Sequence, residues 1–182
     1  MVELVDKTID LCTKFGCKSF LLPVLMKNGI YDGPSFHRAV AYIKRFSERA
    51  AEKGIETCLE INQSVEQIYN LFDAVDNPML KVFFDSQNMY VFDGTSMARY
   101  FTELVDLVGG VHLKDGIGPT LSGSLLGDGT SGFFRTAQAI IDSNYSGRLI
   151  IESVYEKASI CAQGTQIQML AKDVALLRKV FG

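Results

Sequence analysis

The chain of 182 residues is long enough to bury the core of one domain. Hydrophobic residues make up 47% of it and charged residues 21%, a balance typical of a globular protein and not of a disordered one. The net charge of −3, with Lys and Arg dispersed along the chain, argues against a nucleic-acid surface. No apolar stretch reaches the about 18 residues of a membrane span. We therefore expect a single domain whose partner is a small molecule, not a nucleic acid or a membrane.

The first residues read MVELVDKTIDLC, a charged amphipathic segment without the apolar core of a signal peptide. This pattern predicts a cytoplasmic protein. The four cysteines are Cys12, Cys17, Cys58 and Cys161. None of them forms a CxxC pair, so we expect buried thiols and no metal or redox motif.

Short runs of β-branched and aromatic residues alternate with longer amphipathic segments, as is typical of βαβ units with a parallel sheet. In chain order the pattern predicts a helix at 2–15, a strand at 18–24, a helix at 35–53, a strand at 56–61, a helix at 65–75, a strand at 81–85, a helix at 96–107, a strand at 109–114, a helix at 133–143, a strand at 148–152 and a helix from about 165 to 180. Gly16 and Gly54 follow helices as left-handed caps, and Ser64 with Gln67 has the spacing of a capping box.

Polar residues come at the ends of four of these strands: Glu60, Asp85, His112 and Glu152. The carboxyl ends of parallel strands form the active sites of barrels and doubly wound sheets, so these side chains are expected to converge. Alone, each is more often a cap, an ion-pair partner or a core histidine. Three carboxylates in one pocket would repel each other unless a cation or shared protons neutralise them. An oxygen-rich set with one imidazole suits Mn²⁺, Mg²⁺ or Co²⁺, with Zn²⁺ as an alternative.

Five segments carry a resemblance to a known family. They are residues 58–62 (CLEIN), 84–88 (FDSQN), 111–115 (VHLKD), 126–129 (LGDG) followed by Phe133, and 149–152 (LIIE). In this order they resemble the xylose-isomerase-like superfamily of sugar isomerases and epimerases. The resemblance runs from about Gly16 to the end of the chain, and the HLKD and LGDG steps are its most specific parts.

The resemblance implies an α/β fold of the (β/α)₈ TIM-barrel type, truncated at its N-terminus to about five βα units. Residues 1–182 would form one domain that corresponds to strands 4–8, because a full barrel takes about 250 residues. Five strands cannot close into a barrel. The open edges at 18–24 and 148–152 therefore predict self-association or aggregation of this chain, with a homo-oligomer as one outcome.

In the ketose 3-epimerases of this superfamily, the positions matching Glu60, Asp85, His112 and Glu152 bind a metal, with Mn²⁺ as our first expectation. The two glutamates also move protons. The resemblance thus implies an isomerase or epimerase in which the metal polarises a carbonyl and Glu60 and Glu152 act as the acid/base pair. The expected substrate is a sugar or polyol, and no organic cofactor is expected. The residues expected to contact it are Asn62, Asn88 and Lys114.

The chain departs from that pattern at two places. Asn88 stands where the epimerases often carry His, and the loop after Asp115 offers Ser122 and Ser124 but no Arg for a substrate hydroxyl. Three readings therefore stay open beside epimerisation: isomerisation of an aldose or hydroxypyruvate, dehydration of a cyclic polyol of the inosose type, and an inactive metal-binding or assembly fragment. The multi-zinc site of related endonucleases needs several histidines. The chain has two, and one of them, His37, lies in a predicted helix.

Three further residues or segments have alternative interpretations. The LGDG segment at 126–129 is a tight turn ordering the strand ends or, without the Lys of a phosphate-binding loop, a weak candidate for an anion cradle. Lys114 contacts substrate or pairs with Asp115 or another carboxylate. Glu66 lies near Glu60 but is expected in the first turn of a helix, where its charge suits the helix dipole.

Overall fold

The computed structural model describes residues 2–182 and divides into two compact units. Unit 1 ends at Phe83, and unit 2 runs from Phe84 to Gly182. The elements of unit 1 are α1 (Val2–Phe15), β1 (Ser19–Val24), the 3₁₀ turn η1 (Met26–Asn28), α2 (Gly33–Ala51), β2 (Glu56–Ile61), α3 (Val65–Val75) and the start of β3 (Leu80–Asp85). The predicted ranges of α1, β2 and α3 are confirmed without change.

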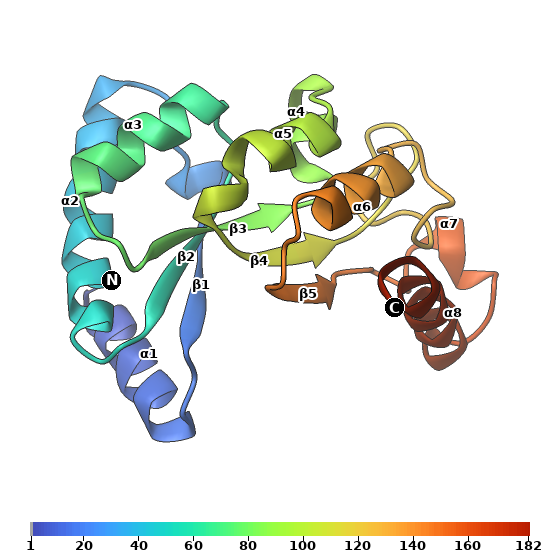
Figure 1. Ribbon diagram of the computed structural model, residues 1–182, viewed down its shortest axis with the longest axis horizontal. Helices are drawn as coiled ribbons and strands as arrows, with labels where there is room; N and C mark the ends of the chain where they lie inside the picture. The colour runs from blue at the N-terminus through green and yellow to red at the C-terminus, as the bar shows by residue number, and fades with distance from the viewer. Residues whose placement is uncertain (1) are drawn as a thin grey trace. The chain divides into compact units, whose positions relative to one another are not determined.

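The three strands of unit 1 form a parallel sheet covered by helices. β1 pairs with β2 along its whole length, and β2 pairs with the start of β3. α1 and α3 both pack on α2 (Figure 1). Val5, Ile9 and Cys12 of α1 share a buried cluster with Phe46 of α2 and Ile55, which the 3- to 4-residue spacing of apolar positions makes possible.

Local sequence signals set the helix ends of unit 1. Gly16 and Gly54 have positive φ angles of 69° and 66°, as the prediction of left-handed caps requires. α2 begins two residues before its predicted start, because the Asp32 carboxylate accepts a hydrogen bond from Ser35 N at 2.7 Å and caps the helix. The capping box of α3 is confirmed: the Ser64 side chain accepts from Gln67 N, and Gln67 accepts from Ser64 N.

We expect Ser64→Ala to lower the free energy of unfolding by about 1 kcal/mol, since it removes the acceptor for one of the first amides of α3. Ser96→Ala is the matched control. Ser96 precedes α5 (Met97–Leu104) without a side-chain cap hydrogen bond, so its loss should cost much less. Urea unfolding followed by circular dichroism measures both. Equal losses for the two variants would contradict the capping role of Ser64.

Unit 2 begins within β3, at Phe84. Its elements are α4 (Asn88–Asp93), α5, the 3₁₀ turn η2 (Val105–Leu107), β4 (Val108–Leu113), α6 (Phe133–Asp142), β5 (Arg148–Ile151), α7 (Ala158–Cys161) and α8 (Gln166–Phe181). β4 pairs with β5 in parallel, and Ser86 N, just after β3, donates to His112 O at 3.0 Å. The strand order therefore follows the chain, from β1 to β5.

The core of unit 2 is aromatic where helices meet strands. Phe84 of β3 contacts Phe101 of α5 edge to face, with ring centroids 5.1 Å apart, and Phe101 contacts Tyr145 in the same way. α5 packs against α6 (Figure 1). Strand β4 is buried at Val111 and Leu113, so its backbone is held firmly where it carries His112.

Short elements were not predicted. η1, α4 and α7 span six residues or fewer, and the helix expected at 96–107 is α5 followed by η2. The expected strand at 109–114 is shifted by one residue, so Lys114 lies directly after β4. Among residues 2–182, no helix combines the length and apolarity that a membrane crossing requires.

The prediction of buried thiols is right for Cys12 and Cys58 and wrong for Cys17 and Cys161, which are exposed. Cys17 follows the Gly16 cap at the end of α1, and Cys161 is the last residue of the short α7. The ends of helices face water more often than their centres do. The sequence pattern alone did not show that Cys17 and Cys161 lie at such exposed positions. In the described part of the chain, no two of these four cysteines form a disulfide.

Candidate metal and substrate site

Three of the predicted ligands lie together at the carboxyl ends of the strands of unit 2. Asp85 is the last residue of β3, His112 is the penultimate residue of β4, and Glu152 directly follows β5. Glu152 N donates to Leu113 O at 2.9 Å, which holds the end of β5 beside β4. One ligand atom from each of the three side chains lies within 4.8 Å of those of the others. This is the spacing at which one ion can be shared.

The two oxygens of the buried Asp85 carboxylate have different environments. Oδ1 accepts hydrogen bonds from the amides of Gln87 at 2.8 Å and Asn88 at 2.7 Å, and so caps the start of α4. Oδ2 lies 2.7 Å from the Nζ of Lys114. Burial raises the pKa of Asp85 to about 6, against the opposing effects of Lys114 and the two amides. Of the two Asp85 oxygens, Oδ1 therefore faces the backbone amides of α4 and Oδ2 faces the Lys114 side chain.

Lys114 pairs with two of the predicted ligands. Its side chain is 7% exposed, and Nζ lies 2.7 Å from Asp85 Oδ2 and 2.8 Å from Glu152 Oε2. Its backbone is fixed, since Lys114 N donates to Ser86 Oγ and that hydroxyl donates to Lys114 O, both at 2.8 Å. Burial lowers the pKa of Lys114, and the two carboxylates more than offset this, so it lies above its ordinary value. Of the interpretations left open, pairing with a neighbouring carboxylate is the one observed.

His112 and Glu152 differ in access to solvent. His112 Nδ1 lies 3.3 Å from Glu152 Oε2, and their side chains are 14% and 42% exposed. Ser122 Oγ donates to the backbone oxygen of Glu152 at 2.9 Å, which fixes the chain just after β5. The cluster therefore has a buried side, formed by Asp85 and Lys114, and an open side at Glu152.

The remaining predicted residues have separate positions. Asn88 is buried in the first turn of α4, and its backbone amide donates to Asp85. Glu60 and Asn62 belong to unit 1: Glu60 is the buried penultimate residue of β2, and Asn62 follows the strand, half-buried. Glu66 lies in the first turn of α3, as expected.

The sequence did not point to Asp115 as a loop anchor. This carboxylate is 1% exposed and accepts hydrogen bonds from the hydroxyl of Ser131 and from the amides of Gly116, Gly127, Gly129 and Ser131. A Cβ at Gly129 would lie 2.2 Å from Asp115 Oδ1, so a glycine is needed there. The LGDG amides bind Asp115, which favours the tight-turn interpretation over a phosphate cradle.

Gln87 and Asp173 hold other parts of the same loop. The buried Gln87 side chain donates to Thr120 O at 3.0 Å and accepts from Ser122 N at 2.8 Å. Asp173 of α8 accepts from Leu126 N, and its other oxygen accepts from the hydroxyls of Ser153 and Tyr155. Burial and the adjacent Asp173 raise the pKa of Tyr155. No local pattern marks these two residues, because their partners are distant in the sequence.

The side chains of this cluster fit a hard or borderline divalent ion. Two carboxylates and an imidazole are oxygen-rich with one nitrogen, and none of the three ligand positions is a thiolate. The second histidine, His37, lies exposed on α2 of unit 1, where its Nδ1 is 2.7 Å from Gly33 O. The described residues therefore give no support to a histidine-rich multi-zinc site.

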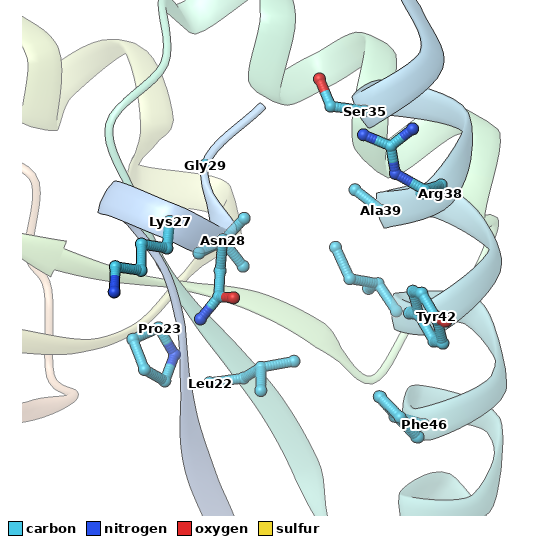
Figure 2. A pocket seen from close by; sticks show the side chains of 12 residues that line it. Leu22, Pro23, Lys27, Asn28, Gly29, Ser35, Arg38, Ala39, Tyr42 and Phe46 are labelled. Carbon is cyan, nitrogen blue, oxygen red and sulfur yellow. The ribbon is translucent and has the colours of Figure 1, made fainter. Parts of the chain in front are cut away.

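A separate cavity of about 230 Å³ lies in unit 1, between β1 and α2. Figure 2 shows Tyr42 and Phe46 on α2 and Leu22 on β1 on opposite sides of it. None of the predicted site residues lines this cavity.

Comparison with known proteins identifies the family. The family model described as "Xylose isomerase-like TIM barrel" matches residues 1–180. The chain belongs to this family. Its parallel strands and covering helices are accordingly part of a TIM barrel, as predicted.

Individual relatives of this xylose isomerase-like chain are longer than it is. A 2-epi-5-epi-valiolone 7-phosphate 2-epimerase from an Actinoplanes species is 29% identical over 154 residues, covering 84% of this chain and 57% of the relative. A xylose isomerase domain protein from Planctomyces limnophilus has a TM-score of 0.83 at 19% identity, over 98% of this chain and 65% of the other. D-Psicose 3-epimerase from Clostridium cellulolyticum H10 has a TM-score of 0.78 at 15% identity, over 98% and 68%. The chain thus spans a little under three-fifths of the curated relative.

Proposed function

We propose that this chain is the larger part of a divalent-metal-dependent sugar isomerase or epimerase, corresponding to strands 4–8 of the barrel. The observation that carries the proposal is the meeting of Asp85, His112 and Glu152 at the ends of adjacent parallel strands. Family membership supports the same reaction class. Relatives named as epimerases of a sugar-like phosphate and of D-psicose favour proton transfer next to a carbonyl over other chemistries of the fold.

In this proposal Asp85, His112, Glu152 and Glu60 hold the ion, with Mn²⁺ as the first choice. Glu60 is included because it lies at the carboxyl end of β2, the strand that pairs with β3. The carboxyl ends of parallel strands carry the active sites of TIM barrels. When bound, the metal supplies Lewis-acid polarisation of the substrate carbonyl.

Glu60 and Glu152 are the proposed acid/base pair. One carboxylate removes the proton from the carbon next to the carbonyl, and the other, protonated, returns a proton to the opposite face. The 42% exposure of the Glu152 side chain leaves it accessible to a substrate. The burial of Glu60 reduces its contact with water, which slows loss of a held proton to solvent.

Asn62, Asn88 and Lys114 are the proposed substrate contacts. Amide and ammonium groups supply the donors and acceptors that sugar hydroxyls need. The Actinoplanes relative is named for a 7-phosphate, so phosphorylated polyols belong among the substrates to test.

The test is exchange of substrate hydrogen with solvent. The protein is incubated with Mn²⁺ and D-psicose, D-tagatose or D-fructose in D₂O, and deuterium entry beside the carbonyl is followed by NMR. We expect exchange, reduced about a hundredfold or more by Glu152→Gln, since general-base contributions are of that order. Glu156→Gln is the control, because Glu156 is an exposed carboxylate in the same segment.

If the protein takes up metal but exchanges no substrate hydrogen, catalysis is rejected and the inactive metal-binding fragment becomes the favoured interpretation. If the protein neither takes up metal nor exchanges substrate hydrogen, both the catalytic function and the metal-binding fragment are rejected. Loss of water from a polyol substrate, seen by product analysis, would point to the dehydratase instead of the epimerase.

A further inference from the structure

The ligand oxygens of Asp85 and Glu152 are already in contact with a cation of the protein itself. The backbone amides of Gln87 and Asn88 use Oδ1 of Asp85, which leaves Oδ2 as the oxygen available to a metal. That oxygen lies 2.7 Å from Lys114 Nζ. The same ammonium lies 2.8 Å from Glu152 Oε2, the oxygen closest to His112.

Lys114 cannot easily move away from these carboxylates while its backbone stays in place. Its N and O are both hydrogen-bonded to the hydroxyl of Ser86, and the side chain is 7% exposed. Asp115, the next residue, is held by the amides of the LGDG turn. Release of Lys114 from the two carboxylates therefore requires rotation of its side chain and no movement of its backbone.

A divalent ion bound by Asp85 and Glu152 would need the oxygens that Lys114 contacts. Two cations at the same pair of oxygens would repel each other, most strongly beside the buried Asp85. We infer that Lys114 is a built-in competitor of the metal: its ammonium neutralises Asp85 and Glu152 until a divalent ion displaces it. This inference rests on the proposed metal site and adds that metal binding is coupled to release of Lys114.

The release gives Lys114 two successive roles. Before metal binding it offsets the repulsion between two carboxylates at the strand ends, so that the strand ends can fold without an ion. After metal binding its ammonium is free to contact a substrate oxygen beside the ion. The proposed substrate-binding role of Lys114 would then depend on metal occupancy.

Titration with MnCl₂ by calorimetry tests the competition in the chain as it exists. We expect Lys114→Met to bind Mn²⁺ about tenfold more tightly than the unaltered chain, because no ammonium must be displaced. In EDTA the same variant should melt at a lower temperature, because Asp85 and Glu152 are left without a counter-charge. Lys179→Met is the control: it removes the same charge from an exposed position on α8 and should change neither value.

The outcomes separate this inference from the proposed function. If the unaltered chain binds Mn²⁺ and Lys114→Met binds it equally or more weakly, the competition is rejected and the proposed metal site stands. If neither protein binds Mn²⁺, the metal site is rejected and the competition with it. If Lys114→Met binds Mn²⁺ and the unaltered chain does not, the competition is supported, because Lys114 then prevents metal binding altogether.

A second variant keeps the test decisive if Lys114→Met does not fold. Adding Asp85→Asn to it removes the uncompensated buried charge, so the double variant should regain a cooperative unfolding transition in EDTA. Failure of the double variant to fold better than Lys114→Met would overturn the inference, because Lys114 would then support the fold by something other than neutralising Asp85.

Discussion

Asp115→Ala should lower the free energy of unfolding by about 4 kcal/mol, the largest stability effect that we expect from one substitution in this chain. The variant leaves the partly buried amides of Gly127 and Gly129 and the buried amide of Ser131 without their acceptor. It also removes the partner of the Ser131 hydroxyl, at 2.6 Å. Chemical unfolding monitored by circular dichroism gives the measurement.

Asp128→Ala is the matched control for this substitution. Asp128 belongs to the same turn, but its side chain is exposed, so its loss should cost a few tenths of a kcal/mol. If the two variants differed by less than about 1 kcal/mol, Asp115 would not be the anchor of the loop.

Asp85→Asn should weaken Mn²⁺ binding by at least about a hundredfold while leaving the chain folded. The asparagine oxygen can still accept from the amides of Gln87 and Asn88, so the start of α4 keeps its cap. The group that replaces Oδ2 is an NH₂, which is a hydrogen-bond donor and no ligand for a cation. Calorimetric titration measures the affinity, and the far-ultraviolet spectrum verifies the fold.

The control here is Asp128→Asn, which removes one carboxylate charge from the surface of the same unit. It should bind Mn²⁺ like the unaltered chain. Unchanged affinity in Asp85→Asn would show that the ion, if bound, is held elsewhere, and the assignment of the strand-end cluster would be wrong.

The sequence was a good guide wherever local rules decide the structure. β2 and α3 have the predicted bounds because an apolar run, a capping serine at Ser64 and its partner Gln67 all lie within a short segment. Asp85, His112 and Glu152 were predicted to meet because strand ends of a parallel sheet share one edge, and within unit 2 they do meet. The roles of all seven predicted site residues stay predictions until they are tested.

What the sequence could not supply depends on contacts between distant segments. Lys114 pairs with Asp85 because both side chains are buried at the same place in the fold. The sequence around Lys114 does not show that its partner is Asp85 and not the neighbouring Asp115. α4 starts because Asp85, a strand residue, caps it, so no conventional cap precedes it. The hydrogen bonds of Asp173 likewise join α8 to residues far back in the chain.

The segment from His112 to Asp115 combines three different tasks in four consecutive residues. His112 faces the ligand cluster, Leu113 is fully buried on the other side of the strand, Lys114 returns to the cluster and Asp115 organises the loop. Because successive strand residues point to opposite faces, inserting or deleting one residue here would exchange the apolar and charged positions. The spacing of this motif therefore constrains the chain as strongly as the identity of its residues. An insertion is better accommodated beyond the motif, in the exposed part of the loop around Pro119.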